Sequence, residues 1–311
     1  MKIVILDAAC VKQHDLNFEC LKNLGTVYEY DRTSSDKITE RIGDAEIVIT
    51  NKIKLTKEIL NKCPNLKYIS VLATGYNTID TKHARKLGID VSNVPSYSTD
   101  SVVQHTFGLI LNAVCGISAH NDAVKRGDWS SHSDFCLCVS NLTELKGKTL
   151  GIIGYGAIGR RVALIAKAFG MKVIFNTRTP IDGSEELNKV LSESDIISLH
   201  CPLTETNDKM INEKTVSLMK DGVIIINTAR GRLIDESAVY NGLCSGKIAF
   251  FAADVLSEEP PKSDNPLLNH SNAIITSHIA WATYESRKRL LQITYDNISA
   301  FLQGKPINVI N

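Results

Sequence analysis

The sequence has no excess of charge, no long apolar run and no leader-like segment, and each absence argues against a class of protein. Its 35 basic and 34 acidic residues nearly cancel over 311 residues, so neither a nucleic-acid nor a membrane surface is indicated. No apolar run approaches the roughly 20 residues that span a bilayer, and we expect no signal peptide before the first strand-like run, Lys2 to Leu6. A protein with no nucleic-acid and no membrane partner is expected.

The eight cysteines are scattered and include no C-x-x-C pair. The one C-x-C, formed by Cys136 and Cys138, has no histidine cluster beside it, so no metal site is expected. Free thiols are typical of the reducing cytoplasm, which is therefore the expected location.

Short β-rich runs alternate with helical patterns along the whole chain. This alternation predicts parallel sheets covered by helices on both faces. The fold class expected is thus α/β with two doubly wound parallel-sheet domains, of which the second has the six strands of a Rossmann domain. The strand-like runs lie at residues 2–6, 45–50, 66–73 and 89–94, and then at 149–153, 172–176, 195–199, 222–227, 249–254 and 273–276.

A longer helix should lie between the two series of strands, because Val103, Phe107, Ile110 and Val114 recur at helical spacing. The stretch 118–145 is more polar and irregular, which indicates a helix end followed by a loop. A last helix is expected through residues 291–302, and the glycine and proline that follow at 304 and 306 end it.

A glycine-rich loop directly follows the first strand of the second series. Gly154, Gly156 and Gly159 form the pattern G-x-G-x-x-G, and a helical pattern from Ile158 to Phe169 runs on behind them. In this strand–turn–helix context the glycines permit a tight turn, close approach of a pyrophosphate and close helix–strand packing. The helix N-terminus favours an anion. The loop therefore predicts a dinucleotide site; the alternative is a glycine-rich turn without a ligand.

The end of the next strand bears on which dinucleotide is bound. An Asp or Glu at this point usually binds the adenosine ribose hydroxyls, but here the strand ends in Phe175, Asn176, Thr177 and Arg178. Asn176 would not repel a 2′-phosphate and Arg178 could pair with one, unless Arg178 points to solvent. NAD(H) and NADP(H) therefore both stay open as the cofactor.

Three residues supply what hydride transfer to a keto acid requires: a cation for the carboxylate, an acid for the forming alkoxide and a partner for that acid. Arg230, Glu259 and His278 each come shortly after one of the last three predicted strands. They should thus lie at the carboxyl edge of the sheet, where doubly wound sheets bind ligands. An arginine fork suits a carboxylate, and a carboxylate beside a histidine orients its ring and favours its protonated form.

Taken singly, each of these three residues has an ordinary explanation. An arginine after a strand is usually a surface charge, a lone histidine is more often structural, and a glutamate before Pro260 usually caps a loop. Their joint placement at one sheet edge favours the catalytic interpretation.

Several motifs resemble, in order along the chain, those of the D-isomer-specific 2-hydroxyacid dehydrogenases. The resemblance covers nearly the whole chain, and ATGYNTID, GDWS and HIAWAT look most like the glycerate dehydrogenase and hydroxypyruvate reductase branch. The motifs are ATGYNTID (73–80), YSTDSVVQHTFGLIL (97–111), GYGAIG (154–159), LHCPLT (199–204), NTARG (227–231), AADVLSEEP (252–260) and SHIAWAT (277–283).

The resemblance implies a role for individual residues in the chemistry. His278 would be the general acid in reduction and the base in oxidation, with Glu259 as its partner. Arg230 would bind the substrate carboxylate and carbonyl, and backbone N–H groups at Thr74 and Gly75 would hold the other side of the carboxylate.

The resemblance also implies residues that line the pocket or contact the cofactor. Trp281 would wall the pocket, with a place in the core as the alternative, and Asp254 would bind the nicotinamide carboxamide, with a helix N-cap as the alternative. The full set of implied cofactor contacts is Gly154, Gly156, Ala157, Ile158, Gly159, Asn176, Arg178, Cys201, Pro202, Thr228, Ala229, Asp254, His278 and Ala280.

The domain organisation and assembly follow from the same resemblance. Residues 1–98 plus 285–311 would form a flavodoxin-like substrate-binding domain and residues 99–284 an NAD(P)-binding Rossmann domain, with a catalytic cleft between them. Members are usually homodimers joined through the nucleotide-binding domain, and the joining arm would lie around 118–145.

The expected activity is NAD(P)-dependent reduction of hydroxypyruvate or glyoxylate, or the reverse oxidation of D-glycerate. A D-lactate, phosphoglycerate or phosphite dehydrogenase on the same scaffold stays open, as does an NAD(H)-sensing, corepressor-like binding protein. Glu259 argues against formate oxidation, because the family's formate dehydrogenases pair the histidine with a glutamine.

Overall fold

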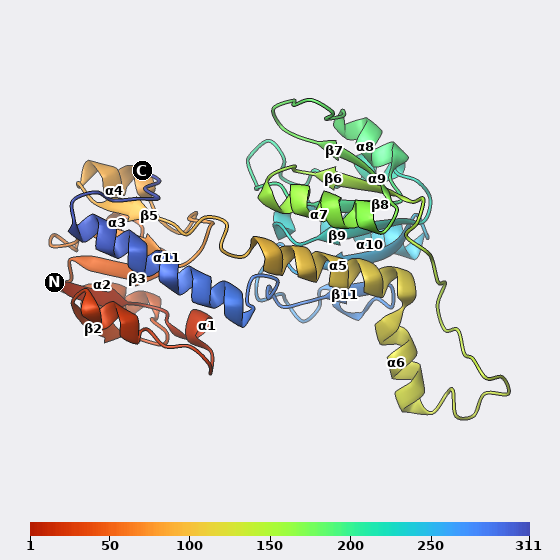
Figure 1. Ribbon diagram of the computed structural model, residues 1–311, viewed down its shortest axis with the longest axis horizontal. Coiled ribbons are helices and arrows are strands. Elements are labelled where there is room, and N and C mark those ends of the chain that lie inside the picture. The colour runs from red at the N-terminus through yellow and green to blue at the C-terminus, as the bar shows by residue number, and fades with distance from the viewer. The chain divides into compact units, whose positions relative to one another are not determined.

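The computed structural model describes all 311 residues, and the chain divides into two α/β units (Figure 1). The first unit comprises Met1–Ser98 and Trp281–Asn311, and the second comprises Thr99–Ala280. Both ends of the chain therefore contribute to the first unit. The chain re-enters it at Trp281, four residues before the boundary at 285 that the sequence suggested.

The first unit is built on a parallel sheet of five strands in the order β2-β1-β3-β4-β5. The strand order reverses between β1 and β3, and every residue of β3 and β4 is buried, as in strands covered on both faces. The strands are β1 (Lys2–Ile5), β2 (Thr26–Glu29), β3 (Ile47–Thr50), β4 (Tyr68–Val71) and β5 (Asp90–Ser92).

Helices cover both faces of this sheet. Helices α2, α3 and α4 pack against one face, and α1 and α11 pack against the other. Helix α11 is anchored by Arg287, which is 2% exposed and donates to both carboxylate oxygens of Asp15 at 2.6 and 2.7 Å. The helices are α1 (Ala9–Lys12), α2 (Ile38–Ile42), α3 (Lys57–Leu60), α4 (Thr81–Lys86) and α11 (Tyr284–Leu302), with 3₁₀ turns at Glu19–Asn23 and Ser35–Lys37.

Strand β2 is an element that the sequence analysis missed. It is the edge strand next to β1, and none of its four residues is buried. An edge strand of this kind needs no apolar run, which was the signal that located the other strands.

The second unit contains a parallel sheet of six strands in the order β11-β10-β9-β8-β6-β7. Here the strand order reverses at β6, which lies between β7 and β8. The predicted fold class, two doubly wound parallel-sheet α/β domains, is confirmed. The strands are β6 (Thr149–Ile153), β7 (Lys172–Asn176), β8 (Ile196–Leu199), β9 (Val223–Asn227), β10 (Ile248–Ala253) and β11 (Ala273–Ile275).

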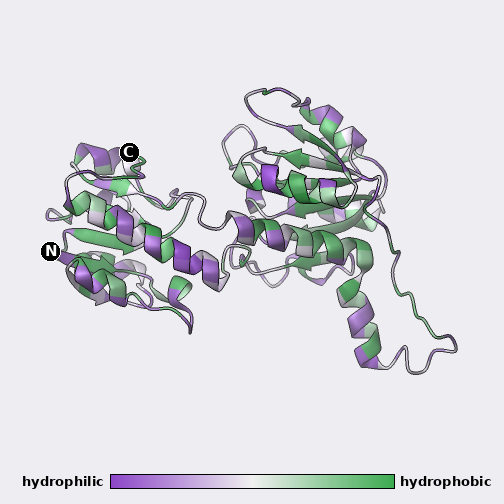
Figure 2. Ribbon diagram, viewed as in Figure 1, coloured by the Kyte–Doolittle hydropathy of each residue, from purple (hydrophilic) through white to green (hydrophobic).

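Helices α5 and α7 cover one face of this second sheet, and α8, α9 and α10 cover the other. Colouring by hydropathy shows apolar strands between helices that are apolar on one side and polar on the other (Figure 2). The helices are α5 (Thr99–Cys115), α6 (Ile117–Arg126), α7 (Ala157–Ala168), α8 (Leu187–Glu193), α9 (Glu213–Leu218) and α10 (Glu236–Cys244), with 3₁₀ turns at Gly231–Leu233 and Pro266–Asn269.

Helix α6 is a separate helix rather than the end of α5. The chain bends by 59° between the two, at Gly116, which has a φ of +57°. Helix α6 and the loop after it extend away from the rest of the second unit (Figure 1). No helix by itself is long and apolar enough to cross a membrane, although the bent pair α5 and α6, taken together, would meet the same criteria of length and composition.

Candidate active site

The glycine-rich loop lies where the strand order of the second unit reverses. The N–H of Gly154 donates to the Asn176 carbonyl at the end of β7 (3.0 Å), and the N–H of His200 after β8 donates to the Ile153 carbonyl (2.7 Å). Gly154 has a φ of +99°, and a Cβ there would lie 2.6 Å from the Cys201 nitrogen. The carboxyl ends of three neighbouring strands thus meet at this loop, where doubly wound sheets bind ligands.

The loop and the helix behind it fit the diphosphate of a dinucleotide. A Cβ on Gly159 would lie 2.2 Å from the Gly154 carbonyl oxygen, so α7 packs directly on the loop. No atom lies within 4 Å of the Cβ position at Gly156, which leaves open space beside the backbone. No side chain caps the N-terminus of α7, so N–H groups of its first turn, including Ala157 and Ile158, are available to an anion.

No carboxylate occupies the end of β7. The side chain of Asn176 donates to the Glu185 carbonyl (2.8 Å) and so belongs to the loop that follows the strand. Arg178 is exposed and pairs with no carboxylate. Phe175 stacks on Tyr155 of the glycine loop with ring centroids 3.7 Å apart. The end of β7 therefore presents no acidic side chain at Asn176 and an exposed, unpaired guanidinium at Arg178.

The residues directly after β8 are uncharged at neutral pH. Removal from water lowers the pKa of His200 to about 3, and its Nε2 lies 2.8 Å from the Ser198 hydroxyl oxygen. Burial raises the pKa of the Cys201 thiol to about 11. His200 is therefore no general acid and Cys201 no nucleophile near pH 7, which leaves backbone contacts as the role open to Cys201 and Pro202.

Strand β9 ends in a turn that presents Arg230. The side chain of Asn227 is fully buried, accepts the N–H of Ala229 (3.0 Å) and donates to the Arg230 carbonyl (2.9 Å). The Thr228 hydroxyl lies 3.0 Å from that of Thr106 in α5. Arg230 is exposed and pairs with no carboxylate; its Nη1 donates to the Ala229 carbonyl at 2.6 Å. The guanidinium is therefore available to a carboxylate ligand.

Glu259 and His278, predicted as partners, are in direct contact. The Nδ1 atom of His278 lies 2.7 Å from Oε2 of Glu259, and the other carboxylate oxygen accepts the N–H of Leu256 (3.1 Å). Glu236 anchors the same loop by accepting the N–H of Ser257 at 2.7 Å. Because Nδ1 faces the carboxylate, Nε2 is the ring nitrogen left for a substrate.

The turn that carries His278 is unusual, because His278 has a φ of +57°. A non-glycine residue in this left-handed region costs on the order of 1–3 kcal/mol and persists only where its surroundings hold it. Asp254, which is 1% exposed, accepts the N–H groups of Ile279 (2.9 Å) and Ala280 (2.8 Å) with its carboxylate and that of His278 (2.8 Å) with its carbonyl. Asp254 and Ala280, predicted as cofactor contacts, thus bond each other.

Thr74, Gly75 and Trp281 lie in the first unit. Asn93 fixes the loop after β4 by donating to the Thr74 carbonyl (2.7 Å), while the N–H groups of Thr74 and Gly75 have no acceptor. Two adjacent free N–H groups can bind a carboxylate. Trp281 packs edge-on to Tyr97, with ring centroids 6.4 Å apart, against the core of this unit.

Several polar residues that bond the loops of the predicted site were not predicted from the sequence. Their contacts join segments more than 120 residues apart for Thr106 and more than 170 apart for Ser101 and His105, so no local pattern marks them. Asn227 is the exception, since it stands beside the predicted contacts and an Asn in a tight turn commonly bonds its own backbone.

Comparison with known proteins identifies the family. Residues 107–280, more than half of the chain, match the model of the D-isomer specific 2-hydroxyacid dehydrogenase, NAD binding domain. The chain is 46% identical to a hydroxypyruvate reductase of Blautia hydrogenotrophica over the full length of both proteins.

Solved structures give the same result. An acyclic imino acid reductase (Bsp5) in complex with NADPH and D-Arg superposes with a TM-score of 0.88 at 33% identity and full coverage of both chains. A D-lactate dehydrogenase from Aquifex aeolicus, complexed with NAD and lactic acid, superposes with a TM-score of 0.84 at 35% identity, covering 98% of this chain and 96% of that one.

The chain therefore belongs to the family of D-isomer-specific 2-hydroxyacid dehydrogenases, as its motifs predicted. It is an oxidoreductase that acts on the CH–OH group of D-2-hydroxy acids with a nicotinamide dinucleotide as cofactor.

Proposed function

We propose that this chain is a hydroxypyruvate and glyoxylate reductase that also catalyses the reverse oxidation of D-glycerate. The observation that carries the proposal is the 2.7 Å contact between His278 and Glu259, which follow neighbouring strands of the dinucleotide-binding unit. The full-length identity of 46% with a hydroxypyruvate reductase supports the choice of substrate. Eight free cysteines fit a reducing cytoplasm, where we place the activity.

Each site residue has a defined task in this reaction. Arg230 binds the substrate carboxylate and polarises the carbonyl with a guanidinium that is always charged. The nicotinamide, when bound, supplies the hydride that reduces the carbonyl carbon. His278 gives the proton on Nε2 to the carbonyl oxygen, and in oxidation the same nitrogen takes the proton from the hydroxyl. Glu259 orients the ring by accepting from its Nδ1. In the first unit taken by itself, the free N–H groups of Thr74 and Gly75 are our candidates for binding a carboxylate.

The residues at the end of β7 favour tolerance of both cofactors. The 2′-phosphate of NADPH would meet no acidic side chain at Asn176, and the exposed guanidinium of Arg178 can form charge-assisted hydrogen bonds to it. An imino acid reductase with NADPH and a lactate dehydrogenase with NAD are both similar to this chain. We therefore propose that NADH and NADPH both support turnover.

Initial rates with hydroxypyruvate, glyoxylate, pyruvate and phosphite, using NAD(P)H or the oxidised cofactor as needed, test substrate and cofactor together. We expect hydroxypyruvate to exceed pyruvate in kcat/KM by at least about tenfold, or about 1.4 kcal/mol of transition-state stabilisation.

Arg178→Gln should lower kcat/KM for NADPH about tenfold or more through loss of a charged hydrogen bond, leaving kcat/KM for NADH unchanged. Arg85→Gln, at an exposed arginine of the first unit that pairs with Asp90, is the control. Higher activity with pyruvate or phosphite contradicts the substrate, and an NADPH rate unchanged in Arg178→Gln contradicts the role of Arg178.

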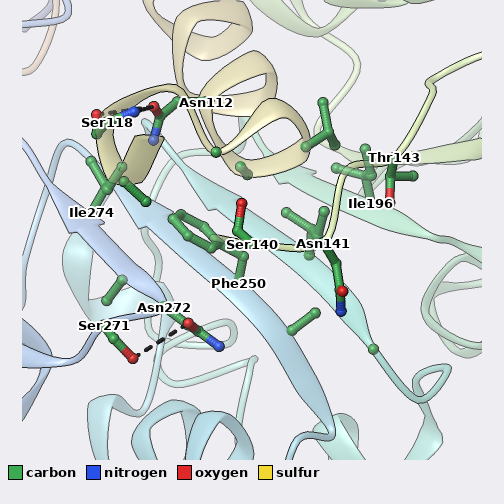
Figure 3. A pocket seen from close by; sticks show the side chains of 18 of the residues that line it. Asn112, Ser118, Ser140, Asn141, Thr143, Ile196, Phe250, Ser271, Asn272 and Ile274 are labelled. Carbon is green, nitrogen blue, oxygen red and sulfur yellow. Dashed lines mark hydrogen bonds between the residues drawn. The ribbon is translucent and has the colours of Figure 1, made fainter. Parts of the chain in front are cut away.

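The extension of the second unit is our candidate for the dimer arm predicted around 118–145. It exposes six large apolar side chains: Ile117, Val124, Trp129, Phe135 (90% exposed), Val139 and Leu142. Between this arm and the sheet lies a hollow of about 1220 Å³. Figure 3 shows its lining, from the α5–α6 bend, the returning loop and strands β10 and β11. Large apolar side chains exposed along one segment often mark an interaction site, and we propose a second copy of this chain as the partner of this arm.

The mass of the protein in solution tests this assembly. Light scattering should give twice the 34.2 kDa of one chain. Phe135→Asp should weaken the dimer by about 2 kcal/mol or more, which is about 30-fold in the dissociation constant, because a charge would replace a ring that the proposed dimer buries. Leu87→Asp, an exposed apolar residue of the first unit, should leave the dimer intact. A wild-type monomer at micromolar concentration, or a Phe135→Asp dimer of unchanged affinity, contradicts the proposal.

A further inference from the structure

Helix α5 carries polar side chains that reach the loops at the carboxyl edge of the second sheet. Ser101 donates through Oγ to the Ala280 carbonyl (2.5 Å), and Nε2 of His105 lies 2.9 Å from the Thr276 hydroxyl oxygen. Ser101 and His105 are four residues apart, so they project from the same face of α5 on successive turns. Together they form hydrogen bonds to residues 276 and 280, which lie on either side of His278.

The donors and acceptors around Thr276 can be assigned from these distances. The Thr276 hydroxyl lies 2.6 Å from Oδ1 of Asp254. An ionised carboxylate only accepts, so Thr276 donates to Asp254 and its oxygen must accept from His105. Nε2 of His105 therefore carries a proton. It also lies 3.5 Å from the same carboxylate oxygen. A directed chain of hydrogen bonds thus runs from His105 through Thr276 to Asp254.

Asp254 is the point at which this chain meets the His278 turn. Its Oδ1 accepts from both the Thr276 hydroxyl and the N–H of Ile279, and its Oδ2 accepts the N–H of Ala280. The direction of the carboxylate therefore sets the position of the backbone on the far side of His278. A carboxylate that is 1% exposed has no water to replace a lost donor. Removal of the Thr276 hydroxyl therefore leaves Oδ1 one donor short, and removal of His105 leaves that hydroxyl free to turn away from Asp254.

We propose that His105 is a positioning residue for His278. By donating to Thr276 it fixes the Asp254 carboxylate, which in turn holds His278 at its positive φ with Nε2 directed toward the substrate. The inference rests on the proposed role of His278 as the general acid. It assigns a function to a histidine of α5 that bonds Thr276, two residues before His278.

The test replaces His105 and Thr276 in turn, each with one residue that cannot form the hydrogen bond and one that can. His105→Leu and Thr276→Val remove the bonds, whereas His105→Gln keeps an N–H donor at the Nε2 position and Thr276→Ser keeps the hydroxyl. We expect kcat for hydroxypyruvate reduction to fall about 10- to 100-fold in the first pair, the scale of a small misplacement of a reacting group. The second pair should recover most of it. The dissociation constant for NADH, from fluorescence quenching, should change by less than kcat does, because Asp254 is only one of the predicted cofactor contacts.

Two further measurements separate positioning from a structural role. The solvent deuterium isotope effect on kcat should increase in His105→Leu and Thr276→Val, because proton transfer from a misplaced His278 becomes slow. The double variant His105→Leu/Thr276→Val should be no slower than the slower single variant, because either single change already interrupts the chain of hydrogen bonds. Thr294→Val, which removes a buried hydroxyl bonded to Leu290 in α11, is the matched control and should keep wild-type kcat.

The outcomes distinguish failure of this inference from failure of the proposed function. His278→Ala is measured alongside, and wild-type turnover in that variant would remove the general acid from the argument. If His278→Ala is inactive but His105→Leu and Thr276→Val keep wild-type kcat, the positioning role is wrong. It is also wrong if the loss appears as weaker NADH binding at unchanged kcat, or if His105→Gln and Thr276→Ser are as slow as the variants that cannot bond.

Discussion

Replacing His278 with alanine is expected to lower kcat for hydroxypyruvate reduction by about 10²–10⁴-fold, the range for removal of a general acid. The fall should appear in kcat and kcat/KM together, because the ring acts on charge that develops in the transition state. Binding of NADH, followed by fluorescence, should be unchanged, since the glycine loop and α7 are untouched.

His83→Ala, at a partly buried histidine of the first unit whose Nε2 lies 2.8 Å from Oδ1 of Asn61, serves as the control. A His278→Ala variant that still turns over near the wild-type rate refutes the mechanism. A wild-type protein that binds NADH but reduces no keto acid would favour the corepressor-like alternative.

The parts of this site that could be predicted are those that follow a strand directly. Arg230 comes three residues after the end of β9, and His278 three residues after the end of β11. In a parallel sheet the carboxyl ends of the strands share one edge, so residues remote in sequence must meet there. The Glu259–His278 contact of 2.7 Å agrees with that reasoning.

The parts that could not be predicted depend on long-range packing or lie at the surface. The separation of 171 residues between His105 and Thr276 leaves no periodic signal. Strand β2 lies at a sheet edge with no buried residue, so it lacks the buried face that a hydrophobic pattern detects. Helix α6 buries Ala123 but exposes Ile117 and Val124, so its larger apolar residues do not mark a core-facing side. Asp254 was predicted as a contact of the nicotinamide, and that contact stays a prediction. In the structure its carboxylate accepts the N–H groups of Ile279 and Ala280, directly after His278.

The second large effect is expected at Gly231, directly after Arg230. A Cβ on Gly231 would lie 1.9 Å from the carbonyl carbon of Leu256, 2.0 Å from its oxygen and 2.4 Å from the nitrogen of Ser257. These are backbone atoms of the loop that leads to Glu259, so no side chain can move aside. Gly231→Ala must therefore displace either the Arg230 turn or the Glu259 loop, and a shift of about 1 Å between them should lower kcat/KM about 10²-fold.

The same overlap should destabilise the fold by about 1–3 kcal/mol, as overpacking does, which thermal or urea unfolding measures. Gly108→Ala separates this effect from the loss of a glycine as such, because no atom lies within 4 Å of its Cβ position and it sits in α5. There alanine, the better helix former, should keep or raise stability. If Gly231→Ala matches wild type in kcat/KM and in the free energy of unfolding, the two loops are not held in contact, and the spacing of Arg230 from the Glu259–His278 pair must be set by something other than this glycine.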